Sequence, residues 1–102
     1  MLKNQEKVRN YEGMILFHPK LEASKLENAI SEVEKIIKEC TQGSVTTENL
    51  GKKSLSFPVK KLNEAFYLLY HFSGDPRSIE KIKEEIKHNE NIVRMMFIRK
   101  EN

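Results

Sequence analysis

The order of two kinds of apolar pattern along the chain is the feature that most limits its fold. Short, nearly continuous apolar runs rich in aromatic and branched residues are typical of β-strands, whereas spacings of three to four residues are typical of amphipathic helices. The first helical stripe runs from Leu26 to Cys40, and the second contains Ile79, Ile82 and Ile86. The pattern predicts strands at residues 10–17, 45–59, 65–72 and 92–98, and helices at residues 22–41 and 76–89.

This β-α-β-β-α-β order predicts an α+β protein with the ferredoxin-like fold, in which two helices cover one face of a four-stranded antiparallel sheet. The first and third strands should be central. Gly51 interrupts the second strand and predicts a bulge, and Pro58 places that strand at an edge because proline has no N–H to donate. Asp75 followed by Pro76 predicts the start of the second helix, and Gly43 predicts the end of the first.

A chain of 102 residues is expected to form a single domain, residues 1–102, with short flexible N- and C-terminal ends. No apolar run approaches the roughly 18 residues that span a bilayer, so no membrane segment is expected. The first residues lack the apolar block of a secretory signal, which makes the cytoplasm the expected compartment. Cys40 is the single cysteine, and its helical spacing predicts a small buried hydrophobe rather than a reactive thiol.

The net charge of +3 is unevenly distributed. The two predicted helices carry seven basic and eight acidic residues, which leaves eleven of the 18 basic residues and seven of the 15 acidic residues elsewhere. The surplus of positive charge therefore lies in the strands, loops and termini. Such a distribution favours a polyanion as a partner.

The face of the sheet that the helices leave uncovered is predicted to be unusually apolar. A sheet covered on one side normally alternates apolar and polar residues, and these strands do not alternate cleanly. An apolar patch of this size favours docking of another macromolecule; the alternatives are that loops or the N-terminal segment cover it, or that the chain self-associates through it. The residues expected on this protein-partner face are Glu12, Met14, Leu16, Tyr67, Leu69, His71, Met96 and Ile98. Arg94 is expected beside them.

The sequence contains no pattern typical of catalysis or metal binding. His18, His71 and His88 fall on a loop, a strand and a helix end without metal-ligand spacing, and the four glycines form no phosphate-binding loop. We therefore expect no catalytic residue, metal, cofactor or small-molecule substrate. Base recognition in the manner of an RNA-recognition motif is not expected either, because the third strand lacks the basic-glycine opening and offers only Tyr67 as an outward stacking platform.

Three stretches of the sequence carry a resemblance. Tyr11-Glu12 and His18-Pro19 stand at the two ends of the first strand, and Asn91-Ile92-Val93-Arg94 opens the fourth. The most specific stretch is Leu50-Gly51-Lys52-Lys53-Ser54-Leu55-Ser56-Phe57-Pro58-Val59. Together these stretches resemble the bacterial small-subunit ribosomal protein six family, in which the positions of Phe57 and Val59 more often hold tyrosine and isoleucine.

The resemblance implies a structural constituent of the small ribosomal subunit that pairs with ribosomal protein eighteen and binds the central domain of the small-subunit ribosomal RNA during assembly. The apolar sheet face would receive the protein, and Lys52 and Lys53 would contact RNA phosphates. The alternative for these two lysines is a solvated edge strand, where lysines also discourage aggregation. Chosen by charge and position alone, the further candidates for RNA contact are Arg9, Lys60, Lys61, Arg94, Arg99 and Lys100. The alternative function is a self-associating ferredoxin-like binding module.

Overall fold

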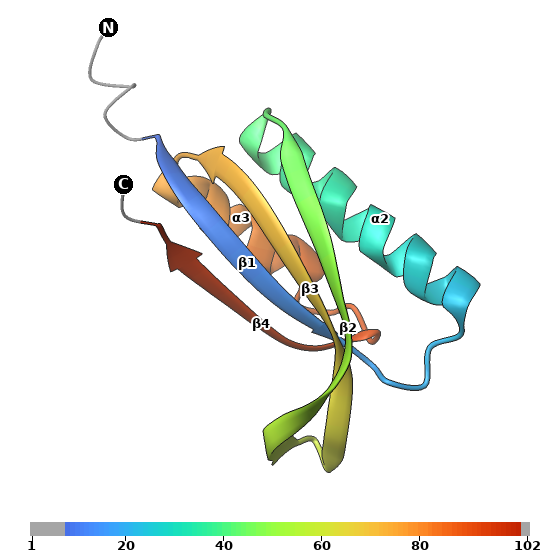
Figure 1. Cartoon of the computed structure of the whole chain (residues 1–102). Coiled ribbons are helices and arrows are strands. Elements are labelled where there is room, and N and C mark those ends of the chain that lie inside the picture. The colour runs from blue at the N-terminus through green and yellow to red at the C-terminus, as the bar shows by residue number, and fades with distance from the viewer. Residues whose placement is uncertain (1–7, 101–102) are drawn as a thin grey trace, which may run out of the picture.

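The computed structural model describes residues 8–100, which form strands and helices in the predicted order (Figure 1). The elements are β1 (Arg9–Phe17), α2 (Ala23–Thr41), β2 (Val45–Val59), β3 (Leu62–Gly74), α3 (Pro76–Ile86) and β4 (Ile92–Arg99). The strands form one antiparallel sheet in the order β2-β3-β1-β4, so β1 and β3 are central and β2 and β4 are the edges. The ferredoxin-like α+β fold and the edge position of the strand that contains Pro58 are confirmed.

Predictions about the ends of the chain concern residues 1–7 and 101–102, which lie outside the described residues. A single domain over the whole chain therefore stays a prediction.

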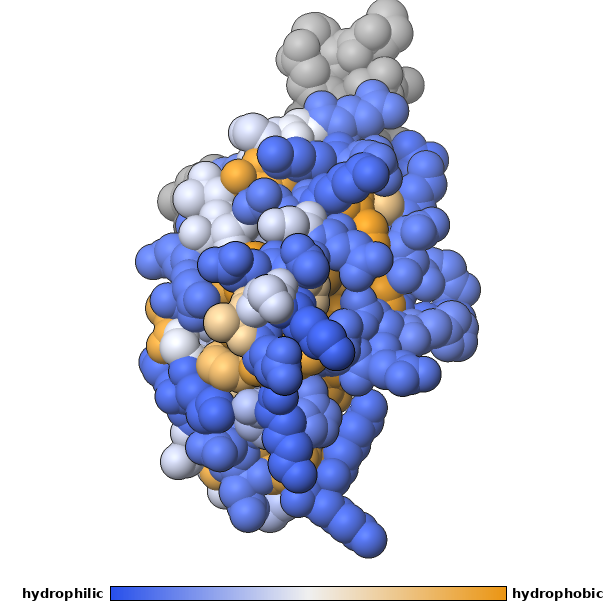
Figure 2. All heavy atoms as spheres, turned by 90° about the vertical axis from the view of Figure 1, so that its right-hand side faces the viewer, coloured by the Kyte–Doolittle hydropathy of each residue, from blue (hydrophilic) through white to orange (hydrophobic). Residues whose placement is uncertain are grey.

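Both helices lie on the same face of the sheet and enclose the main core (Figure 1). The helical stripes predicted from residue spacing form the inner sides of α2 and α3, and Cys40 packs half-buried at the margin. Seen from the side of α2, the surface is mainly hydrophilic, with apolar atoms visible in the gaps between polar side chains (Figure 2). The largest fully buried side chains are Tyr70, Phe17, Ile15, Ile37, Leu68, Ile82, Ile86 and Val33.

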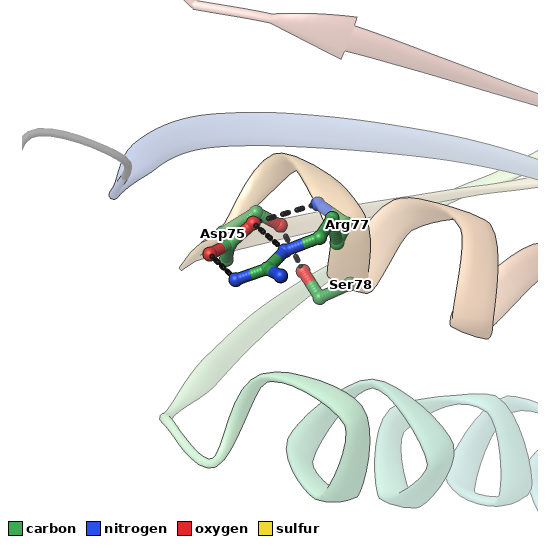
Figure 3. A network of polar contacts seen from close by, with 3 residues as sticks. All are labelled: Asp75, Arg77 and Ser78. Carbon is green, nitrogen blue, oxygen red and sulfur yellow. Dashed lines mark hydrogen bonds and ion pairs between the residues drawn. The ribbon is translucent and has the colours of Figure 1, made fainter. Parts of the chain in front are cut away.

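Asp75 caps α3 as predicted (Figure 3). Its Oδ1 accepts a hydrogen bond of 2.8 Å from the backbone N–H of Arg77, and its carbonyl oxygen accepts one of 2.5 Å from the Ser78 hydroxyl. The Arg77 guanidinium also donates to the Asp75 carboxylate, and this contact raises the pKa of Arg77. With Pro76 in the first turn, where no N–H is needed, the cap determines where the chain leaves β3 and enters the helix.

The first helix ends at Thr41, as predicted, but its cap differs: Gln42, and not Gly43, adopts the left-handed conformation, with φ of 57°. The backbone N–H of Gln42 donates to the Lys38 carbonyl oxygen at 2.6 Å and closes the last turn. The second helix ends at Ile86, three residues before the predicted end at residue 89. Local capping contacts, which apolar spacing does not report, determine these ends.

The bulge predicted at Gly51 is confirmed. Asn49 pairs with Leu68 and Gly51 pairs with Tyr67, so Leu50 is an extra residue in β2. Gly51 has φ of 85°, a conformation that glycine adopts at least cost, and the Asn49 side chain accepts a hydrogen bond of 2.8 Å from its N–H. Beyond the bulge, β2 and β3 continue as a hairpin that projects past the part of the sheet covered by the helices (Figure 1).

Tyr70 connects the sheet to α2 through a hydrogen bond in the main core. Its hydroxyl donates to the Ile30 carbonyl oxygen at 3.0 Å, and the side chain is fully buried. Burial, reinforced by the nearby Glu34 carboxylate, raises the pKa of Tyr70 above its ordinary value of 10.0. The folded protein therefore retains the phenol proton to higher pH than the unfolded chain does.

Replacement of Tyr70 by phenylalanine should lower the free energy of unfolding by about 1 kcal/mol, because the hydrogen bond to Ile30 is removed while the packing is kept. Above pH 10 the unfolded chain releases the phenol proton first, so the unfolding free energy of the unsubstituted protein falls as pH rises, and that of Tyr70→Phe falls less steeply. Denaturant titrations at about pH 7 and about pH 11 measure both effects. Tyr67→Phe, at a half-buried tyrosine on the opposite face, is the matched control; an equal loss of stability in both variants would contradict the assignment.

Candidate nucleic-acid and protein interfaces

The face of the sheet opposite the helices, called here the open face, consists of rows of cross-strand neighbours. Residues directly paired in an antiparallel sheet point to the same side, so the register defines each row. From β2 through β3 and β1 to β4, the rows are Thr46, His71, Glu12 and Ile98; Glu48, Leu69, Met14 and Met96; and Gly51, Tyr67, Leu16 and Arg94. The eight residues predicted for the protein-partner face, and Arg94 beside them, therefore share one face.

The middle of the open face is apolar and partly accessible. Ile98 is 55% exposed and Met96 is 43% exposed, and Met14 and Leu69 lie half-buried in the same row as Met96. Exposed apolar side chains in adjacent rows form a continuous patch rather than isolated surface hydrophobes.

Leu16 does not belong to this accessible patch, although it points to the predicted side. It is only 4% exposed, because Leu55 and Val59 of the hairpin pack into the cluster that it forms with Ala65 and Val93. Leu16 therefore lies on the predicted face but is not accessible in the isolated chain, and its contact with a partner stays a prediction. Part of the uncovered face is closed by the chain's own β2–β3 hairpin, which is part of the sheet and not one of the loops considered from the sequence.

An ionic cluster occupies one end of the open face. His71 Nε2 lies 2.7 Å from Glu48 Oε1, and His71 Nδ1 lies 3.6 Å from Glu12 Oε2. Lys100 Nζ lies 3.7 Å from the same Glu12 oxygen. Two carboxylates around one imidazole make this end of the face acidic. Glu12 and His71 were predicted here from the sequence, but Glu48 was not, because its position depends on the register of β2 against β3.

Lys52 and Lys53 hold their ammonium groups over aromatic rings on opposite sides of β2. Lys52 Nζ lies 5.1 Å from the centroid of the Phe66 ring, which packs against the main core on the helix side. Lys53 Nζ lies 5.9 Å from the centroid of Tyr67, on the open face. Each contact orients a charge beside the edge strand. One RNA strand can therefore contact both ammonium groups only if it passes around the edge of the sheet.

The hairpin ends in a two-residue turn, Lys60-Lys61, whereas the predicted strands left residues 60–64 between them. Val59 pairs with Leu62 on either side of the turn, and the φ angles of Lys60 and Lys61 are 53° and 66°. A turn with two positive φ angles is most stable with Asn-Gly, because side chains larger than glycine are strained in this conformation. Two lysines therefore occupy a position where their backbone is costly to hold.

The eight basic residues predicted to contact RNA fall into two groups at opposite ends of the sheet. The nine residues of β1 separate the groups by roughly 25 Å at about 3.3 Å per residue. At the far end, Lys100 already contacts Glu12. The group at the hairpin end contains Lys52, Lys53, Lys60, Lys61 and Arg94, and the group at the far end contains Arg9, Arg99 and Lys100.

Neither metal-binding nor membrane-spanning features are found within residues 8–100. No three His, Cys, Asp or Glu side chains there are grouped to hold a metal ion, and no helix is long and apolar enough to cross a membrane. Burial raises the pKa of the Cys40 thiol above its ordinary value. His18 accepts a hydrogen bond of 3.2 Å from the Lys20 backbone N–H and so serves the turn after β1.

The fold, the partly exposed apolar face and the basic hairpin define a binding domain of the ferredoxin-like class. Residues 10–99 match the family described as Ribosomal protein S6, and the chain belongs to this family. It is 31% identical over 94 residues to the small ribosomal subunit protein bS6 of Heliobacterium modesticaldum, covering 92% of this chain and 98% of that protein. The bS6 protein of Thermosynechococcus vestitus is also 31% identical, over 88% of this chain and 79% of its own length.

The solved structure of 30S ribosomal protein S6 from Thermotoga maritima agrees with the fold, with a TM-score of 0.85 and 27% identity over 92% of this chain and 89% of that one. The family consists of structural ribosomal proteins, not enzymes, which confirms the predicted family and the non-enzymatic role. Membership also agrees with the predicted location in the cytoplasmic ribosome.

Replacement of the turn Lys60-Lys61 by Asn-Gly should raise the free energy of unfolding by about 1 kcal/mol, because both new residues tolerate positive φ angles. Thermal and denaturant unfolding measure the change. The control variant Lys60→Ala with Lys61→Ala removes the same two charges but keeps the backbone strain. If the alanine variant gained as much stability as the Asn-Gly variant, relief of charge repulsion and not relief of strain would be the cause.

Proposed function

We propose that this chain is a structural constituent of the small ribosomal subunit that pairs with ribosomal protein eighteen and binds the central domain of the small-subunit ribosomal RNA during assembly. Family membership supports the ribosomal part of the proposal. The observation that carries the rest is the meeting of two surfaces at the row of Tyr67, Leu16 and Arg94. On one side of this row lies the accessible apolar patch, and on the other lies the basic hairpin.

The chemistry of the open face supports a protein as its occupant. Met96 and Ile98 offer apolar area, whereas Glu12 and Glu48 present carboxylates at the end of the face beyond them. A partner that supplies apolar side chains and a cation next to them would bury the patch and neutralise the acidic end. The two carboxylates, with only Lys100 beside Glu12 to offset them, make that end of the open face less favourable for RNA phosphates than the hairpin.

The chemistry of the hairpin supports RNA as its occupant. Residues 51–63 contain four lysines and no acidic residue. Phosphate contacts of this kind give affinity and position without reading the base sequence. The proposed mechanism is therefore assembly: the protein partner covers the open face, and the joint surface binds folded RNA.

RNA binding by this protein, alone and mixed with ribosomal protein eighteen, to a fragment of the central domain tests the proposal. Tight binding by the mixture and poor binding by this chain alone are expected. A self-associating module is the competing function, favoured by the exposure of Met96 and Ile98. If the partner makes no difference to RNA binding and the isolated protein sediments as a dimer, the self-associating module replaces the proposal.

The double variant Met96→Glu, Ile98→Glu should weaken association with ribosomal protein eighteen roughly tenfold or more, because two charges would have to be buried at the interface. Titration calorimetry measures the association. Both side chains are exposed in the isolated protein, so the fold should be kept. The matched control is Ser24→Glu, Ser31→Glu, which adds the same charge on the exposed side of α2. An equal effect of both variants would show that the open face is not the site.

Replacement of Lys52 and Lys53 by alanine should weaken RNA binding and flatten its salt dependence. Removal of one phosphate contact reduces the slope of log affinity against log salt by about one unit. The control variant Lys35→Ala, Lys38→Ala removes two exposed lysines of α2 and the same net charge. Binding measured over a series of salt concentrations should show an unchanged slope for the control. An unchanged slope for Lys52 and Lys53 would reject these residues as phosphate contacts.

A further inference from the structure

Phe57 is the most exposed large apolar side chain among residues 8–100, at 78%. It lies where β2 leaves the ladder with β3. Pairing stops at Ser54 with Glu64 and resumes at Val59 with Leu62, so four residues of β2 stand opposite Asn63 alone. Phe57 belongs to this looped-out segment on the edge strand, and the following Pro58 has no N–H to re-form the ladder.

The apolar residues on either side of Phe57 are packed against the protein, whereas Phe57 is not. Leu55 and Val59, two residues before and two residues after it, pack into the cluster around Leu16. Burial of a phenylalanine side chain stabilises a fold, and most of that contribution is absent here because the ring is exposed. The ring is therefore presented to solvent by a segment whose other apolar residues are partly buried.

The charges around Phe57 identify the kind of molecule that suits it. The hairpin beyond the Gly51 bulge, residues 51–67, carries four lysines and one carboxylate, Glu64, and Lys60 and Lys61 occupy a turn that is strained for them. A lone aromatic ring among ammonium groups has the arrangement that binds unpaired nucleotides, in which a base stacks on the ring and the phosphates lie near the cations. A protein hot spot would instead need an apolar surround, and the nearest apolar side chains pack into the cluster around Leu16.

We propose that Phe57 is a stacking platform for an unpaired nucleobase of RNA, held at the tip of the hairpin by phosphate contacts of Lys60 and Lys61. This inference rests on the proposed RNA-binding function and adds to it a contact that is not electrostatic. Stacking tolerates any base, because every base has a flat π-face. The hairpin would therefore recognise the presence of an unpaired nucleotide and not its identity.

Four substitutions of Phe57 test the platform in the mixture with ribosomal protein eighteen, using the central-domain RNA fragment. Phe57→Ala should weaken RNA binding roughly 5- to 150-fold with an unchanged salt slope, because stacking releases no counterions. Phe57→Leu keeps apolar bulk without a ring and should lose a similar amount, whereas Phe57→Tyr should bind like the unsubstituted protein. Phe57→Trp introduces the single tryptophan of the chain, and its fluorescence should be quenched by the RNA.

Each competing outcome identifies what has failed. If Phe57→Ala binds RNA as tightly as the unsubstituted protein, stacking is overturned while the proposed function stands. The same holds if Phe57→Leu keeps full RNA affinity while Phe57→Ala loses it. Weakened association of Phe57→Ala with ribosomal protein eighteen in the absence of RNA assigns the ring to the protein partner instead, and overturns the inference. If the unsubstituted protein in the mixture does not bind the fragment, the proposed function fails and stacking falls with it. A fragment in which all nucleotides are paired should bind Phe57→Ala and the unsubstituted protein alike; a persisting difference also overturns stacking.

Discussion

The coverage of a four-stranded sheet by only two helices is the constraint on which the rest of this structure depends. One face is closed by the stripes of α2 and α3, and Tyr70 connects that face to the α2 backbone through Ile30. The other face has no layer of its own, yet its central residues are apolar. Part of it is closed by the hairpin, through Leu55 and Val59 over Leu16, and the remainder stays partly accessible. The same strands therefore provide both the core and the proposed binding surface.

The length of the β2–β3 hairpin turns this constraint into two separate surfaces. The half of the hairpin near the helices completes the sheet. The other half passes beyond the helices, so its side chains do not have to pack against a helix. The Gly51 bulge marks the change between the two halves. Lysines held over Phe66 and Tyr67 then place positive charge on both sides of the edge strand. The accessible apolar patch and most of the hairpin lysines thus lie on adjoining parts of the sheet, an arrangement that suits the proposed contact with both a protein and a polyanion.

Local patterns were enough to predict the elements, their order and the cap at Asp75, because helical stripes and capping signals depend on residues that are close in the sequence. The division of Lys52 and Lys53 between two faces could also have been read, since adjacent strand residues point to opposite sides. The burial of Leu16 and the position of Glu48 on the open face could not be predicted in this way. Both depend on how β2 is paired with β3 beyond an inserted residue, and one inserted residue changes which face every later side chain occupies.

Lysines on an edge strand have two physical explanations, protection against strand pairing and contact with a polyanion, and the hairpin distinguishes between them. Protection is served by charge on the exposed ladder, and Lys52 and Lys53 suit it. It does not explain Phe57, because an exposed aromatic ring on an edge strand favours the association that the lysines would prevent. Nor does it explain Lys60 and Lys61, since a turn of Asn-Gly would close the hairpin with less strain. An exposed ring beside a strained basic turn suits the proposed contact with an anion that also offers a flat apolar face, and unpaired RNA has both properties.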